Sequence, residues 1–161
     1  MALDTENGPE GQTEYITFRI GEEEYCIEIT LVREIRRWTN ATRLPHAPDY
    51  LKGVVNLRGA VVPVVDFSAR LGGPATETTA RHTIIIVESG GQTIGLLVDA
   101  VSDILAAGEE HMQPTPQIAP REVHEIISGL IVVDDRILRR VMVGSLLSEV
   151  KLDDQPAMAT A

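Results

Sequence analysis

Cysteine is almost absent from this sequence: Cys26 is the only one in 161 residues. A single cysteine excludes an intrachain disulfide and suits a reducing compartment. Long hydrophobic runs are also missing, because no apolar stretch approaches the roughly 20 residues that a helix needs to cross a bilayer. Segment 1–11 is polar and acidic, without the basic and apolar parts of a signal peptide. We therefore expect a chain that neither carries a leader nor inserts into the membrane.

Aromatic and basic residues are both scarce. Aromatics make up 4% of the chain, and its 43% hydrophobic content is dominated by Val, Ile and Leu, which favours β structure with aliphatic cores. The 14 basic residues are outnumbered by 24 acidic ones, which gives a net charge of −10. Such a chain has no long-range attraction for nucleic acid or anionic lipid. The composition therefore favours a protein partner.

The spacings typical of metal, nucleotide and hydrolase sites are not found. The four histidines lie too far apart in the sequence to show the spacing of a zinc site: His46, His82, His111 and His124. There is also no P-loop and no G-x-S-x-G motif. We expect no metal and no cofactor.

Two carboxylates leave one catalytic alternative open. Asp66 and Asp99 each end an apolar strand, and a pair of acids in such places is able to act as the acid and base of a small β-barrel hydrolase. Acids at strand ends more often accept backbone N–H bonds in a turn. The second interpretation is favoured, and we expect no enzyme.

The most informative segment is 51–66, LKGVVNLRGAVVPVVD. It predicts two apolar strands joined by a turn at Arg58–Gly59, where the glycine permits a positive φ. Asn56 and Arg58 are polar residues in an otherwise apolar hairpin. An arginine held on a stiff hairpin suits a docking surface, because its planar fork pairs with carboxylates and backbone acceptors. The alternative is a hairpin whose polar tip is merely solvated.

Alternating and continuous apolar runs predict the other elements. We expect a hairpin over 16–29, a helical turn and strand over 31–37, a short helix over 50–52, a second hairpin over 83–98, a connector over 107–120, a third hairpin over 129–143 and a terminal helix over 146–152.

An internal repeat underlies this order. Segment 25–35 aligns with 94–104, which places Glu34 on Asp103, and segment 51–71 aligns with 127–147, which places Gly53 on Gly129. The turn Arg58–Gly59 falls on Asp134–Asp135. The same elements in the same order indicate two similar β units. Short strands without covering helices solve the problem of exposed edges by closing, so we expect each unit to be a small barrel.

Three segments together resemble the CheW-like chemotaxis coupling family: 44–66, 93–104 and 25–35. The resemblance covers roughly residues 14–150. It implies a mainly β fold of two packed SH3-like five-stranded β-barrels with short helices, flanked by disordered tails at 1–13 and 151–161.

The resemblance also implies a function. Members of this family are non-catalytic adaptors that link the cytoplasmic tips of methyl-accepting chemoreceptors to the regulatory domain of the chemotaxis histidine kinase, which carries a related domain. We accordingly expect a stand-alone cytoplasmic adaptor associated with membrane-bound receptor arrays. An adaptor of the same fold in a non-flagellar pathway, such as twitching motility or development, is the alternative.

The resemblance carries a set of site residues with it. Positions implicated in coupling in the family fall on Val32, Glu34, Gly53 and Arg58; we add Asn56 and Gly59, which build the turn, and Leu97 and Val98, near the groove between the barrels. For Glu34 and Arg58 the alternative is a structural ion pair of small energetic value.

The last strand departs from the family pattern. Arg139 and Arg140 stand where relatives usually keep apolar residues, and Met142 stands where Asp66 stands in the first repeat. We expect a modified edge of the second barrel here, which leaves open a variant contact with the kinase.

Overall fold

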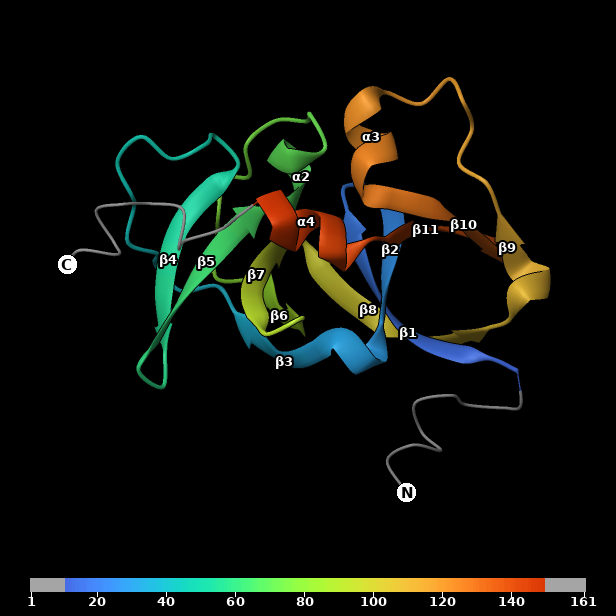
Figure 1. Ribbon diagram of the computed structural model, residues 1–161, viewed down its shortest axis with the longest axis horizontal. Helices are drawn as coiled ribbons and strands as arrows, with labels where there is room; N and C mark the ends of the chain where they lie inside the picture. The colour runs from blue at the N-terminus through green and yellow to red at the C-terminus, as the bar shows by residue number, and fades with distance from the viewer. Residues whose placement is uncertain (1–10, 150–161) are drawn as a thin grey trace.

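Two β-sheets form the body of the molecule and lie side by side along its long axis (Figure 1). The structure, a computed structural model, describes residues 11–149. In chain order the elements are β1 (Thr13–Ile20), β2 (Glu23–Glu28), η1 (Ile29–Leu31), β3 (Val32–Arg37), β4 (Leu51–Leu57), β5 (Ala60–Asp66), α2 (Phe67–Arg70), β6 (Thr83–Ser89), β7 (Gln92–Val98), β8 (Ala100–Ala107), η2 (Glu109–His111), β9 (Met112–Gln113), α3 (Arg121–Ile126), β10 (Ile127–Val133), β11 (Arg136–Val141) and α4 (Val143–Glu149).

Each sheet curls around a small core of its own. The six-stranded sheet, which we call barrel A, has the order β8-β1-β2-β11-β10-β9, and the five-stranded sheet, barrel B, has the order β3-β6-β7-β5-β4. The core of barrel A includes Tyr15, Ile131 and Leu138. The core of barrel B includes Val62 and Ile86. This mainly β architecture with short helices confirms the predicted fold class.

The two repeats exchange their first hairpins. β1 and β2 come from the first repeat but pair with β8 and β11 of the second, and β6 and β7 of the second repeat pair with β3 and β5 of the first. The outer pairings, β1–β8 and β3–β6, are antiparallel, and the inner ones, β2–β11 and β5–β7, are parallel. Each barrel is therefore built from both halves of the chain.

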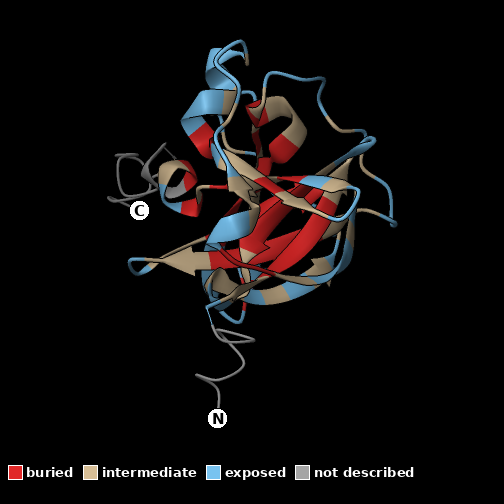
Figure 2. Cartoon of the chain, turned by 90° about the vertical axis from the view of Figure 1, so that its right-hand side faces the viewer, coloured by how far each residue is buried: buried red, intermediate tan, exposed pale blue. Residues whose placement is uncertain are grey.

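The largest core, which we call the shared core, lies where the two barrels meet. Figure 2 shows buried residues along strands in the middle of the molecule and exposed ones in the outer loops. The aromatic centre of the shared core is Phe18, which stacks on Tyr25 with ring centroids 5.6 Å apart and meets the edge of Phe67 at 5.5 Å. Aliphatic side chains from the second repeat, such as Val87 and Ile94, complete it. Because both halves contribute, this core holds the exchanged hairpins in place.

Several local predictions need correction. The helix expected over 50–52 is the start of β4, because Leu51 is buried and pairs with Val65. The connector expected over 107–120 contains η2 and also β9, whose Met112 pairs with Ile131. α3 was not expected at all, and α4 begins at Val143 rather than residue 146.

The first described strand begins within a predicted tail. β1 begins at Thr13, inside the segment predicted as a tail, because Thr13 pairs with Ala107 of β8. Segments 1–10 and 151–161 of the predicted tails lie outside the described residues. Among residues 11–149, no helix combines the length and the apolar character needed to cross a membrane.

The expected modification of a barrel edge at Arg139 and Arg140 is wrong, because β11 lies inside its sheet between β2 and β10. Both arginines are used within the molecule. Arg140 pairs with Glu28 at 2.8 Å, and the guanidinium of Arg139 lies 5.5 Å from the ring centroid of Tyr25. They give β11 and β2 an ionic and a cation–π contact.

Removing the ring of Phe18 tests the role of the shared core. We expect Phe18→Ala to lower the free energy of unfolding by about 3–5 kcal/mol, because it leaves a cavity among fully buried side chains from both repeats. Urea denaturation followed by circular dichroism measures the change. Val61→Ala, at an exposed position, serves as the control. A loss for Phe18→Ala no larger than that of the control would contradict the described packing.

Candidate functional site

The open end of barrel B forms a groove of about 760 Å³, which we call the barrel-end groove. It lies between the start of β3, the tip of the β4–β5 hairpin and the tip of the β6–β7 hairpin. Its lining residues are Arg33, Glu34, Leu57, Arg58, Ala60, Val61, Val62, Pro63, Ile86, Glu88, Gly91, Gln92 and Thr93. Apolar side chains form the floor, and charged ones stand around the rim.

Two ion pairs cross the rim. Arg58 Nη2 lies 2.5 Å from Glu34 Oε2, and Arg33 pairs with Glu88. In both pairs the arginine is the more exposed partner: the side chain of Arg58 is 74% exposed and that of Glu34 is 28%. The hydrogen bond from Arg58 lowers the pKa of the Glu34 carboxyl. The rim therefore presents two guanidinium groups to solvent, on a protein whose net charge is −10.

The hairpin tip holds Arg58 in a fixed conformation. Arg58 has φ +50° and Gly59 has φ +90°, so both central residues of the two-residue loop adopt the left-handed conformation that matches the twist of the strands. Asn56 Oδ1 accepts a hydrogen bond from Gly59 N at 2.9 Å. Sequence reasoning anticipated the positive φ only at the glycine. Asn56 and Gly59 thus shape the turn, and Arg58 and Glu34 fix the position of the guanidinium.

Gly53 has a different, purely steric role. Its φ is +147°, and a Cβ at this position would lie 2.4 Å from the carbonyl oxygen of Thr42. Thr42 forms a bridge with Val54 and so lies against β4. Gly129, the equivalent residue of β10, lets Gln113 of β9 approach in the same manner. Gly53 therefore lets the segment after β3 pack against β4.

The remaining predicted site residues do not line the groove. Val32 is partly buried and packs against the shared core, although it is adjacent to the groove residue Arg33. Leu97 is buried in the core of barrel B, and Val98 is buried in the shared core. Neither Leu97 nor Val98 exposes a side chain to a partner.

The two carboxylates of the hydrolase alternative serve separate turns. Asp66 is buried, and its two oxygens accept hydrogen bonds from the N–H and hydroxyl of Thr76, each at 2.7 Å. Asp99 accepts a hydrogen bond from Gly21 N at 2.7 Å. Both thus play the turn-capping role that strand-end acids usually play.

Only Glu34 and Arg58 of the groove residues were predicted from the sequence; Arg33, Glu88 and Val61 are among those that were missed. Arg33 and Glu88 pair across β3 and β6, and only the strand register, which the sequence does not display, brings them together. Val61 is a hydrophobic residue that is 49% exposed. It lies inside a continuous apolar run, so no alternation of apolar and polar residues marked it as a surface residue.

Comparison with known proteins decides the family. The CheW-like domain family matches residues 14–151. The chain belongs to this family. The chemotaxis protein CheW of Rhizobium meliloti is 50% identical over 136 residues, which cover 84% of this chain and 88% of that protein. A probable chemotaxis protein CheW of Rhizobium etli is 47% identical over 140 residues, covering 87% and 90%.

A solved structure agrees with these relatives. The crystal structure of the scaffolding protein TtCheW from Thermoanaerobacter tengcongensis superimposes with a TM-score of 0.74 at 30% identity, covering 80% of this chain and 88% of that one. Protein PilI of Pseudomonas aeruginosa matches over only 86 residues, at 30% identity. The predicted resemblance is confirmed, the chain is a chemotaxis scaffold protein, and the non-flagellar alternative is less favoured.

A glycine substitution tests the steric role of Gly53. We expect Gly53→Ala to lower the free energy of unfolding by about 2 kcal/mol or more, because the new Cβ meets backbone at a positive φ. Gly144→Ala is the control: it lies in α4, has open space around it, and gains helix propensity. Thermal denaturation of both variants gives the comparison, and equal stability of the two would contradict the close approach of Thr42.

The pKa of Glu34 reports the rim ion pair directly. We expect Arg58→Met to raise this pKa toward the ordinary glutamate range, because the hydrogen bond from Arg58 is the main cause of its lowering. A lowered folded-state pKa means that the pair stabilises the fold above the usual carboxyl range and ceases to do so as the pH falls through the folded value. Carboxyl NMR titration gives the measurement, with Arg81→Met as control. An unchanged Glu34 pKa in Arg58→Met would show that the pair is absent in solution.

Proposed function

We propose that the protein is a non-catalytic adaptor that binds the cytoplasmic tips of chemoreceptors and the regulatory domain of the chemotaxis histidine kinase. Its family membership and the scaffold relative support this role. The structural roles of Asp66 and Asp99 are consistent with it, since both carboxylates are engaged in turns. The adaptor would work in the cytoplasm, next to receptors in the membrane.

The barrel-end groove is the proposed contact for the kinase, and the exposure of Arg58 over an apolar floor is the observation that carries this proposal. Leu57, Val62 and Ile86 offer an apolar floor to one protruding aliphatic side chain. Arg33 and Arg58 suit carboxylates or carbonyl groups around that side chain, because guanidinium groups bind such acceptors in a fixed geometry. Burial of the aliphatic side chain supplies affinity, and the charges set orientation.

The receptor contact is assigned to the edge strands β3 and β8. Val32 and Glu34 of the family's coupling positions lie on β3. Ile35 on β3 and Ile104 on β8 are exposed isoleucines at equivalent positions of the two repeats. Exposed aliphatic residues on these two edge strands suit a helical receptor tip, which presents apolar side chains at regular intervals.

Direct titration tests the adaptor role. We expect separate, saturable binding of the full chain to a receptor signalling-tip fragment and to the kinase regulatory domain, measured by isothermal titration calorimetry. Binding to neither fragment would refute the proposed function. Binding to only one would refute the linking role.

A charge reversal tests the groove as the kinase contact. We expect Arg58→Glu to keep the melting temperature within a few degrees and to weaken binding of the kinase regulatory domain by about tenfold or more, because it places an acid where the partner's acceptors dock. Arg81→Glu is the matched control, because Arg81 is exposed and lies away from the groove. Arg81 precedes β6, and Glu88 of the groove lies near the other end of that strand. Equal affinities for the two variants would remove the groove from the contact.

A further inference from the structure

The repeat gives barrel A an end equivalent to the barrel-end groove, but there an arginine occupies the place of a small residue. Ala60 follows the first hairpin turn and pairs with Leu57, and Arg136 follows the second and pairs with Val133. The two residues thus have the same position in the two hairpins. Ala60 lines the groove.

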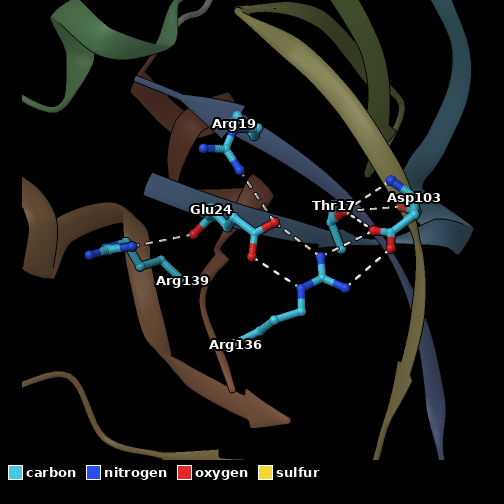
Figure 3. A network of polar contacts seen from close by, with 6 residues as sticks. All are labelled: Thr17, Arg19, Glu24, Asp103, Arg136 and Arg139. Carbon is cyan, nitrogen blue, oxygen red and sulfur yellow. Dashed lines mark hydrogen bonds and ion pairs between the residues drawn. The ribbon is translucent and has the colours of Figure 1, made fainter. Parts of the chain in front are cut away.

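The neighbours of Arg136 correspond to groove residues as well. Figure 3 shows Arg136 between Glu24 and Asp103, with Arg19 paired to Glu24 and Thr17 bonded to Asp103. The strand pairings of the two barrels place these four side chains around Arg136 at the positions that Thr93, Glu34, Glu88 and Ile86 take in barrel B, all of which line the groove. The same framework therefore carries a groove in one barrel and a charged network in the other.

Arg136 is held by two carboxylates at once. Its Nε and Nη2 donate to Glu24 at 3.1 Å each, and its Nη1 and Nη2 donate to Asp103 at 3.1 and 3.2 Å. Thr17 Oγ1 also donates to Asp103. The hydrogen bonding from Arg136 and Thr17 lowers the pKa of the Asp103 carboxyl, and the contribution of Arg136 is the larger one. A guanidinium fixed by two acceptor pairs has little freedom to swing away.

The network stands over the core of barrel A. Side chains two residues apart on a strand point to the same face, so Arg136 lies on the same side of β11 as Leu138, which is fully buried in that core. In barrel B the same relation joins Ala60 and Val62, and there Val62 lines the open groove. The side chain of Arg136 is 31% exposed, against 74% for Arg58.

We propose that Arg136 determines specificity between the two barrel ends: it closes the end of barrel A to the kind of protruding aliphatic side chain that the barrel-end groove accepts. The statement that the kinase's related domain supplies this side chain rests on the proposed function. The closure of barrel A does not rest on it. Because the two ends differ, the adaptor offers a directional contact rather than two interchangeable ones, as a head-to-tail assembly requires.

Thiol labelling tests the closure without any partner. Single cysteines placed at the equivalent positions Val62→Cys and Leu138→Cys are exposed to methyl methanethiosulfonate. Both variants also carry Cys26→Ala, because the native Cys26 is buried in the same core as Leu138 and would add a second thiol there. We expect Val62→Cys to react about tenfold or more faster than Leu138→Cys, since a closed site reacts only through local opening.

Adding Arg136→Ala to Leu138→Cys should bring its labelling rate up to that of Val62→Cys, while Arg136→Lys leaves it slow. Should Arg136→Ala alone fail to fold, its combination with Glu24→Thr, which copies Thr93 of the groove and removes an acid that has lost its main partner, gives the same test. Equal rates at the two cysteines, or a Leu138→Cys rate that Arg136→Ala leaves unchanged in a folded protein, would overturn the closure.

A binding measurement tests the specificity. Ala60→Arg copies Arg136 into barrel B, and we expect it to weaken binding of the kinase regulatory domain about tenfold or more. Ala80→Arg adds the same charge at an exposed position outside the groove lining, and we expect it to leave binding unchanged. Equal binding of wild type and Ala60→Arg would overturn the selection of barrel ends. A labelling contrast without any binding by the wild-type chain would instead refute the proposed kinase contact and leave the closure supported.

Discussion

The exchange of hairpins between the two repeats is the constraint on which the rest of the structure depends. β1 and β2 complete the barrel of the second repeat, and β6 and β7 complete that of the first. The parallel pairings β2–β11 and β5–β7 lie inside the sheets, so undoing the exchange would break both barrels and open the shared core. Two units that are each too small for comfortable stability thereby become one cooperative structure.

The exchange also determines what each barrel end contains. In the barrel-end groove, Glu34 and Arg58 come from the first repeat, and Glu88 comes from the second. At the other end, Glu24 comes from the first repeat, and Arg136 comes from the second. Duplication supplies one framework twice, and a few side chains make the two copies chemically different. An adaptor gains from this arrangement, because a rigid scaffold then carries surfaces that do not compete for the same partner.

Much of the fold and part of the candidate site could be predicted from the sequence. Hydrophobic periodicity located the principal hairpins, the repeat aligned their strands, and the polar tip at Arg58 marked the candidate site. The exchange of hairpins could not be predicted, because an alignment of repeats does not say which strands pair. Leu97 and Val98 were assigned to a surface, but neighbouring residues of a strand point to opposite faces, and both faces of β7 are covered. The two-residue β9 carries no local signal of its own.

Methyl NMR of the full chain, titrated with the kinase regulatory domain, is the most direct check on an open groove at one barrel end and a closed one at the other. We expect shifts that centre on the methyl groups of Leu57, Val61 and Val62, with little change at Leu138, the equivalent of Val62 in barrel A. Shifts centred on Leu138, with Val61 and Val62 unaffected, would contradict this difference between the barrel ends.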